Sequence, residues 1–275
     1  MNETNSYFEY DVAPRLRYRV FDKYPELLAF FSTKQGGVST DYHASMNLGF
    51  YNNDDRNNVI NNHKIFAKAC GYDYKKIIMP KQVHKTDIFV IKDYEQCGRG
   101  VINEEELLEF DGLVTNLKNI PLLTSYADCV PLYLYDPVKL VIGLAHSGWK
   151  GTVSKIGTKM VQKMTEEYNC NPKDIICVIG PSICKECYEV SADLYEAFSK
   201  EYSLACMNEL FTKKENDKYL LDLQLACKYN FLEADITKDN IFMPDYCTCC
   251  SHDIFFSHRK TNGKRGNLVA VMMLK

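Results

Sequence analysis

The chain has 275 residues, 46% of them apolar and 25% charged, and its 36 acidic against 33 basic groups leave a formal net charge of -3. This length and composition exclude bulk disorder and allow one large core or two modest ones. The near-neutral balance gives no electrostatic footprint for nucleic acid, so we expect no nucleic-acid partner. The apolar runs fall far short of the ~20 residues that cross a bilayer, so we expect no membrane partner.

The start of the chain and its cysteines predict a cellular compartment. Glu3, Glu9 and Asp11 lie near the N-terminus, which lacks the basic start and apolar run of a secretory signal. The twelve cysteines make up ~4% of the chain, below the ~8–10% of a disulfide scaffold. We therefore expect a cytoplasmic protein whose thiols are mostly reduced.

The first half of the chain predicts one helix followed by short strands. No linker or repeat divides the sequence, which predicts a single domain over residues 1–275. Apolar residues repeat on one helical face over residues 54–71, and Gly71 suits a left-handed cap. Asp136 and Pro137 predict a hairpin between the last two of the apolar runs. Strands are expected over residues 77–79, 88–91, 112–115, 122–124, 130–135 and 140–145.

The second half predicts further helices and strands. A glycine-containing loop after His146 leads into a periodic stretch from Val153 to Tyr168, which predicts a helix. Ser191 and Asp222 are good N-cap residues for two more helices. Strands are expected over residues 175–179, 241–243, 254–257 and 268–274. The whole pattern predicts an α+β fold, a mixed β-sheet sandwich flanked by helices.

Three side chains at expected strand ends form a candidate metal site. His84 and His146 stand where a strand gives way to a loop, and Cys129 precedes the run over residues 130–135. Two imidazoles and one thiolate are three of the four ligands of a tetrahedral zinc, with the fourth position open for water. Alternatively, Cys129 is a buried small hydrophobe and both histidines are hydrogen-bonded surface residues.

A second group of cysteines forms a rival candidate. One C-x-x-C motif and one C-x-C-C motif would together supply a four-thiolate zinc site, which is structural because it has no open position. The bland alternative is a set of reduced thiols in loops and at strand ends. The cysteines concerned are Cys184, Cys187, Cys247, Cys249 and Cys250.

A basic, glycine-containing turn near the C-terminus is a candidate anion site. Residues 257–266 include Arg259 and Arg265, and guanidinium groups bind phosphate with two parallel hydrogen bonds. A solvated basic turn is the alternative. Near the front of the chain, residues 31–39 form a polar glycine loop whose amides would be able to approach a ligand.

Nine motifs in order along the chain resemble those of the YfiH-like family, which has been labelled laccase-domain or multicopper polyphenol oxidase. Its members are described as purine nucleoside phosphorylases with adenosine deaminase activity. The resemblance covers residues 31–274, the motif-bearing core. It rests on Phe31-Ser-Thr-Lys-Gln-Gly-Gly-Val-Ser39, Met46-Asn-Leu-Gly49, Gln82-Val-His84, Asp111-Gly-Leu-Val-Thr115, Ala127-Asp-Cys-Val-Pro131, Ala145-His-Ser-Gly-Trp-Lys-Gly151, Ile179-Gly-Pro-Ser-Ile183, Tyr188-Glu-Val190 and Phe256-Ser-His-Arg259.

The resemblance implies a sandwich fold like that of a bacterial cysteine-hydrolase toxin domain. It also implies that His84, Cys129 and His146 are both the metal ligands and the catalytic residues. Substrate and phosphate binding fall, by the same resemblance, to basic residues around the pocket, namely Arg259, Arg265 and Lys34.

The activity implied is a zinc-dependent phosphorolysis of purine nucleosides to base and ribose-1-phosphate, together with deamination of adenosine to inosine. The implied nucleosides are adenosine, inosine, guanosine and methylthioadenosine, and phosphate is the second substrate. The oligomeric state is expected to be a monomer or a weak dimer.

Three other functions remain open at this point. Copper polyphenol oxidation, as in a laccase, needs many more histidines than the six present. Amide hydrolysis in the editing of cytoplasmic peptidoglycan precursors would use the same cysteine and histidines. A non-enzymatic binding domain stabilised by zinc would use the second group of cysteines.

Overall fold

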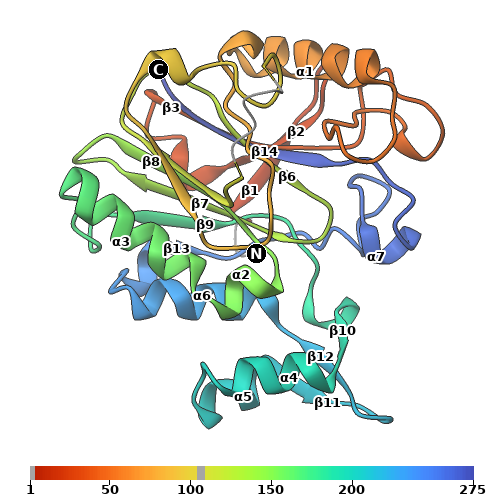
Figure 1. Cartoon of the computed structure of the whole chain (residues 1–275), viewed down its shortest axis with the longest axis vertical. Helices are drawn as coiled ribbons and strands as arrows, with labels where there is room; N and C mark the ends of the chain where they lie inside the picture. Colours follow the sequence, from red (N-terminus) through yellow and green to blue (C-terminus); the bar gives the residue numbers. More distant parts are fainter. Residues whose placement is uncertain (1–3, 104–108) are drawn as a thin grey trace.

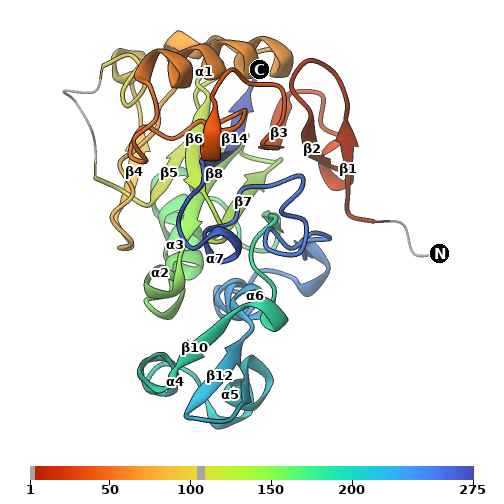
Figure 2. The same cartoon turned by 90° about the vertical axis from the view of Figure 1, so that its right-hand side faces the viewer.

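Two β-sheets packed face to face form the centre of the molecule, and helices cover their outer sides (Figures 1 and 2). The computed structural model describes residues 4–103 and 109–275. A smaller lobe, which contains a three-stranded sheet, extends from one end of this body (Figure 1). The predicted α+β sandwich flanked by helices is confirmed.

The five-stranded sheet is antiparallel and has the order β1-β2-β3-β14-β6. Its strands are β1 (Ser6–Glu9), β2 (Arg15–Tyr18), β3 (Leu27–Ser32), β6 (Leu122–Tyr126) and β14 (Leu268–Leu274).

The six-stranded sheet is mixed and has the order β13-β9-β7-β8-β5-β4. Only the edge pairs β13 with β9 and β4 with β5 are parallel. Its strands are β4 (Ile88–Ile91), β5 (Gly112–Thr115), β7 (Val130–Asp136), β8 (Val141–Ser147), β9 (Ile176–Ile179) and β13 (Ile241–Phe242).

The helices divide between the two outer faces and the lobe. The lobe contains α4, α5 and strands β10 (Glu189–Ser191), β11 (Phe211–Lys213) and β12 (Lys218–Leu221). The α-helices are α1 (Arg56–Cys70), α2 (Trp149–Val153), α3 (Ile156–Tyr168), α4 (Ala192–Ser199), α5 (Leu204–Leu210), α6 (Leu223–Glu233) and α7 (His258–Thr261). Short 3-10 helices are η1 (Arg19–Phe21), η2 (Asp41–His43), η3 (Tyr74–Lys76), η4 (Tyr94–Gln96), η6 (Lys185–Cys187) and η7 (Lys238–Asn240).

The central strands are apolar throughout because both of their faces are buried. In β14, Val271 packs with Phe66 of α1, whereas Ala270 and Met272 pack between the two sheets with Tyr133. A third apolar cluster joins the outer face of the six-stranded sheet to α3, α6 and the lobe. Apolar contacts are therefore continuous from the six-stranded sheet into the lobe.

Most of the expected elements are present, with two corrections. Asp55 caps α1 by accepting a hydrogen bond from the amide of Asn57, and Gly71 ends the helix with φ of 79°. Residues 77–79 make only an isolated bridge between Ile78 and Leu122, not a strand. Residues 254–257 are not a strand either, because their start is held in a turn in which the amide of Phe255 bonds the carbonyl of Ser251 at 2.9 Å.

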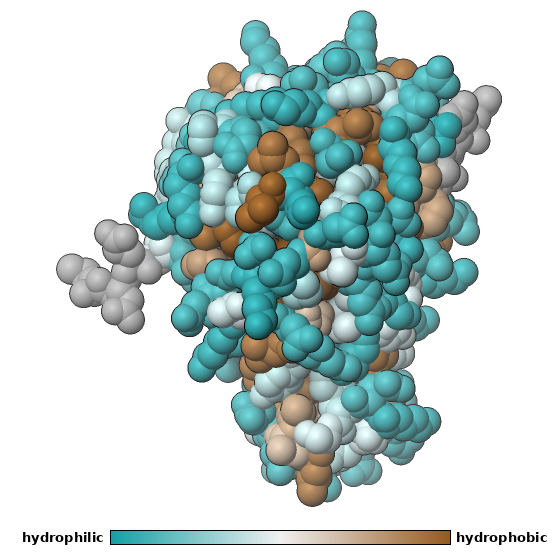
Figure 3. All heavy atoms as spheres, turned by 90° about the vertical axis from the view of Figure 1, so that its left-hand side faces the viewer, coloured by the Kyte–Doolittle hydropathy of each residue, from teal (hydrophilic) through white to brown (hydrophobic). Residues whose placement is uncertain are grey.

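The face of the molecule in Figure 3 is largely polar, and hydrophilic side chains separate several smaller apolar groups on it. Among the described residues, no helix combines the length and the apolar character needed to cross a membrane.

Candidate functional site

The hairpin of β7 and β8 brings Cys129 beside His146. The two strands are antiparallel, and Pro131 lies opposite His146. Cys129 directly precedes β7, and His146 lies near the end of β8. Residues far apart in sequence therefore meet at the open end of the hairpin.

Two neighbouring strands bring Asp111 and His84 to the same edge of the sheet. Gly112, the first residue of β5, pairs with Ala145 of β8, which places Asp111 next to His146. β4 runs parallel to β5, so the loop that carries His84 ahead of β4 lies at this edge too. His84 itself has a φ of 58°, in the left-handed region, so the loop bends sharply at this residue.

His84, Cys129 and His146 form a compact cluster at this edge. Their ligand atoms all lie within 4.8 Å of one another. The two imidazole rings are 4.8 Å apart and nearly perpendicular. His146 is buried, Cys129 half-buried and His84 exposed, so the cluster is open on one side. Two imidazoles and a thiolate with an open side form a donor set that suits zinc.

Asp111 holds two members of the cluster through one fully buried carboxylate. Its Oδ1 accepts a hydrogen bond from Nδ1 of His146 at 2.9 Å. The amides of Val83, His84 and Lys85 donate to the same carboxylate at 3.2, 3.1 and 2.8 Å. With Nδ1 engaged, Nε2 of His146 is the ring nitrogen that remains for a metal, an arrangement common in zinc sites.

Burial and charge act in opposite directions on this pair. Burial by itself would raise the pKa of Asp111, but the hydrogen bond and charge of His146 and the amides of Lys85 and Val83 lower it. Burial by itself would lower the pKa of His146, but Cys129 and Asp111 raise it to about 9. Burial, together with the charge of His146, lowers the pKa of His84. Asp111 is therefore an anion that supports the cluster rather than a proton donor.

The cluster lies between two cavities, both lined by His84 and Cys129. The larger has a volume of about 600 Å³ and also receives His146. The smaller has a volume of about 340 Å³ and is lined by Asp128 and Tyr188 among others. The larger cavity falls within the ~300–1,000 Å³ range of small-molecule sites.

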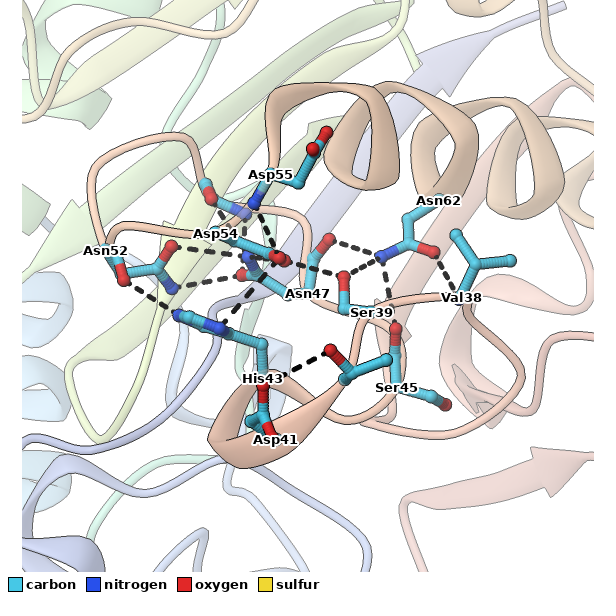
Figure 4. A network of polar contacts seen from close by, with 12 residues as sticks. Val38, Ser39, Asp41, His43, Ser45, Asn47, Asn52, Asp54, Asp55 and Asn62 are labelled. Atoms are coloured by element: carbon cyan, nitrogen blue, oxygen red, sulfur yellow. Dashed lines mark hydrogen bonds and ion pairs between the residues drawn. The ribbon is translucent and has the colours of Figure 1, made fainter.

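A polar network fixes the loop that forms one wall of the larger cavity (Figure 4). Nδ2 of Asn47 donates to Oδ2 of Asp54 at 2.8 Å, and Ser39 donates to the same oxygen at 2.6 Å. Asn52, a lining residue, donates through Nδ2 to the carbonyl of Arg265 at 3.2 Å. The loop before α1 is thereby tied to the basic turn near the C-terminus.

Of the predicted anion-binding residues, the structure brings only Arg265 to the larger cavity. Its Nη1 donates to Oδ1 of Asn267, and its Nε is buried with no partner among the described residues. Burial lowers the pKa of Arg265, and the nearby charges of Cys129 and Asp128, which act to raise it, only partly offset this effect.

Arg259 and Lys34 lie elsewhere. Arg259 points toward the smaller cavity's wall, where its Nη1 donates to the carbonyl of Cys187 at 3.0 Å and its guanidinium lies over Tyr188. Nζ of Lys34 donates to the carbonyl of His252 at 2.6 Å. Neither side chain lines the larger cavity, because each is drawn to a backbone carbonyl of a neighbouring loop.

Two further residues shape the cluster, although the sequence alone predicts no role for either. Asp111 belongs to one of the nine motifs, and its place directly before a strand is the only signal of its role. Gly148 lies so close to the cluster that a Cβ there would be 2.8 Å from Nδ1 of His84 and 3.3 Å from Sγ of Cys129. Only the three-dimensional structure shows that position 148 requires glycine.

Comparison with known proteins places the chain in a family. Residues 28–275 match the family model described as multi-copper polyphenol oxidoreductase laccase. The chain belongs to this family. The resemblance to the YfiH-like family is thus confirmed.

The family's relatives include proteins named as enzymes. The chain is 35% identical over 251 residues to "Purine nucleoside phosphorylase YlmD" of Bacillus subtilis (strain 168), covering 91% of this chain and 89% of that protein. It is 32% identical to "Adenosine deaminase RL5" of an unknown prokaryotic organism, covering 87% and 91%. The crystal structure of hypothetical protein YfiH of Bacillus licheniformis matches with a TM-score of 0.91 at 32% identity, covering 98% of this chain and 99% of that one.

Asp111→Asn should weaken metal binding at the cluster. The amide keeps the shape of the carboxylate but loses the charge that orients His146, and such supporting partners are worth about 10- to 100-fold in metal affinity. Competition with a chromophoric chelator measures this loss. Asp87→Asn is the control, because Asp87 is exposed nearby and lines neither cavity. Unchanged zinc affinity in Asp111→Asn would contradict this role.

Gly148→Ala should disturb the cluster, and Gly151→Ala should not. The added methyl at 148 would collide with His84 and Cys129, whereas at 151 its nearest neighbour lies 3.4 Å away, an ordinary contact. We expect Gly148→Ala to lose most of its bound zinc while keeping its far-ultraviolet circular dichroism spectrum. Equal zinc content in the two variants would show that the close approach of Gly148 to His84 and Cys129 is not required for zinc binding.

Proposed function

We propose that the protein is a zinc-dependent purine nucleoside phosphorylase that also deaminates adenosine. The observation that carries the proposal is the cluster of His84, Cys129 and His146 at the wall of a nucleoside-sized cavity that also holds Arg265. One relative named as a purine nucleoside phosphorylase and another named as an adenosine deaminase support it. Adenosine, inosine, guanosine and methylthioadenosine are the proposed nucleosides.

The donor inventory favours zinc over the copper of the family's name. A multicopper oxidase needs a trinuclear centre with many histidines besides the electron-entry copper. Of the six histidines, His63 is buried with Nε2 bonded to the carbonyl of Leu48, and His43 bonds the carbonyl of Asn52. In residues 4–103 and 109–275, no group of metal donors contains more than two histidines.

The larger cavity offers the surfaces that a nucleoside requires. Tyr42, Phe50 and Tyr51 supply aromatic faces, and Asn52 and Asn267 supply polar groups. Aromatic faces pack against a planar purine, while amide groups hydrogen-bond to ring atoms and ribose hydroxyls.

Arg265 is the proposed phosphate-binding residue. In phosphorolysis an oxygen of phosphate forms a bond to C1′ of the ribose as the bond from C1′ to the purine nitrogen breaks, and the electron pair leaves with the base. A buried guanidinium with an unpartnered Nε holds such an anion with charge-assisted hydrogen bonds. Asn267 orients that guanidinium by accepting from its Nη1.

Deamination uses the same cavity with water in place of phosphate. Zinc bound by His84, Cys129 and His146 supplies a Lewis acid that activates water. Asp128 is the only carboxylate among the described residues that line the two cavities. Its two oxygens accept hydrogen bonds from Thr248 Oγ1 and from the amide of Arg259, both at 2.7 Å, so we assign it a positioning role.

Phosphate should decide which product forms from adenosine. With phosphate present we expect ribose-1-phosphate and purine base, and without it we expect inosine alone, because each reaction needs its own nucleophile. Mass spectrometry of products from zinc-loaded protein measures both. Free ribose that forms without phosphate would point to a hydrolase, and oxidation of a laccase dye after copper removal would contradict the metal assignment.

Arg265→Ala should lower phosphorolysis far more than deamination. Charge-assisted contacts are worth about 1.5–3 kcal/mol, so the expected loss in phosphorolysis is roughly 10- to 100-fold. Arg265→Lys should restore only part of the phosphorolysis rate, because the lysine ammonium carries the charge but cannot make the two parallel hydrogen bonds of a guanidinium. Lys260→Ala, at an exposed position on α7, is the control with unchanged rates. Equal losses of both activities would contradict the assignment of phosphate binding to Arg265.

A further inference from the structure

Four cysteines from two distant segments meet outside the cavity walls. Cys184 and Cys187 precede β10, and Cys247 and Cys250 lie between β13 and α7, with 63 residues separating Cys184 from Cys247. Each pair is a C-x-x-C turn, and the four sulfur atoms lie within 4.8 Å of one another. Cys249, which the sequence grouped with them, is buried and outside this set.

The sulfur atoms have the spacing of ligands around one ion. Sγ of Cys250 lies 3.4 Å from Sγ of Cys187 and 3.9 Å from Sγ of Cys184. A tetrahedron with zinc–sulfur bonds of ~2.3 Å has sulfur–sulfur edges of ~3.8 Å. A disulfide needs ~2.05 Å, so the thiols are close but unpaired.

Hydrogen bonds from the backbone hold the two C-x-x-C turns together. A parallel bridge joins Ser182 to Cys247, and the amide of Thr248 donates to the carbonyl of Ser182 at 3.1 Å. The amides of Cys184 and Cys250 both donate to Sγ of Cys247, at 3.2 and 3.4 Å. Amides aimed at a sulfur atom stabilise a thiolate, the form in which cysteine binds metal.

We propose that Cys184, Cys187, Cys247 and Cys250 form a second, structural zinc site with four thiolate ligands. The site leaves no open position, so its role is to hold chain segments together. The evidence for it depends neither on the proposed activity nor on the cluster at His84.

This site braces the wall of the catalytic cavities. Thr248, inside the second C-x-x-C turn, donates to Asp128, the residue before Cys129. Arg259 of α7 donates through its amide to Asp128 and through Nη1 to the carbonyl of Cys187. A zinc ion here would therefore fix the turn before β7 relative to α7, which leads into the turn that carries Arg265.

Zinc analysis of separate variants distinguishes the two sites. We expect two zinc ions per wild-type chain, one in Cys129→Ala and one in the double variant Cys184→Ser/Cys250→Ser, measured by inductively coupled plasma mass spectrometry. Cys206→Ser, which changes a half-buried thiol on α5, should keep both. Cys129→Ala that keeps both ions would contradict the cluster at His84 and leave the four-thiolate site standing. A double variant with the wild-type zinc content would overturn the four-thiolate site.

A second measurement does not depend on the folding of the double variant. X-ray absorption of zinc-loaded Cys129→Ala should give four sulfur neighbours at ~2.3 Å. A shell dominated by nitrogen or oxygen would overturn the proposal. So would a thiol titration of anaerobically purified, unfolded wild-type protein that finds these cysteines joined as disulfides.

Discussion

The buried carboxylate of Asp111 is the interaction on which the site depends. It accepts hydrogen bonds from three consecutive amides of the loop at His84 and from the ring of His146, which belongs to a different strand. This one carboxylate thus fixes a loop that makes no β-sheet hydrogen bonds. It also leaves Nε2 as the ring nitrogen of His146 that is free to bind a metal. Because the carboxylate is fully buried, removal of any partner would leave a charge poorly compensated.

The sandwich gives that carboxylate a rigid support. β5, β7 and β8 are buried on both faces, between the five-stranded sheet on one side and α3 and α6 on the other. The starts of β4, β5 and β7 and the end of β8 therefore meet at one fixed edge. The walls of the larger cavity come from loops, and side-chain networks such as that of Asn47 and Asp54 hold them in place.

The local sequence pattern correctly predicted the strands that position the site. It gave wrong predictions where contacts between distant segments determine the backbone conformation. The runs over residues 130–135 and 140–145 predicted a hairpin, and that hairpin places Cys129 next to His146. The apolar side chains of Phe255 and Phe256 predicted a strand, yet both are buried from irregular backbone that follows a turn. The roles of His84, Cys129 and His146 came from resemblance, since their spacing alone left a structural explanation open. The need for glycine at position 148 is not predictable from the sequence, because the side chains that crowd it, His84 and Cys129, come from other segments of the chain.

Anomalous diffraction at the zinc absorption edge from crystals of the zinc-loaded protein is the most direct measurement of the central claim. We expect a peak about 2.0–2.3 Å from Nε2 of His146, a ring nitrogen of His84 and Sγ of Cys129, with the Asp111 carboxylate still hydrogen-bonded to Nδ1 of His146. A fully occupied zinc elsewhere, with none among these three side chains, would contradict it.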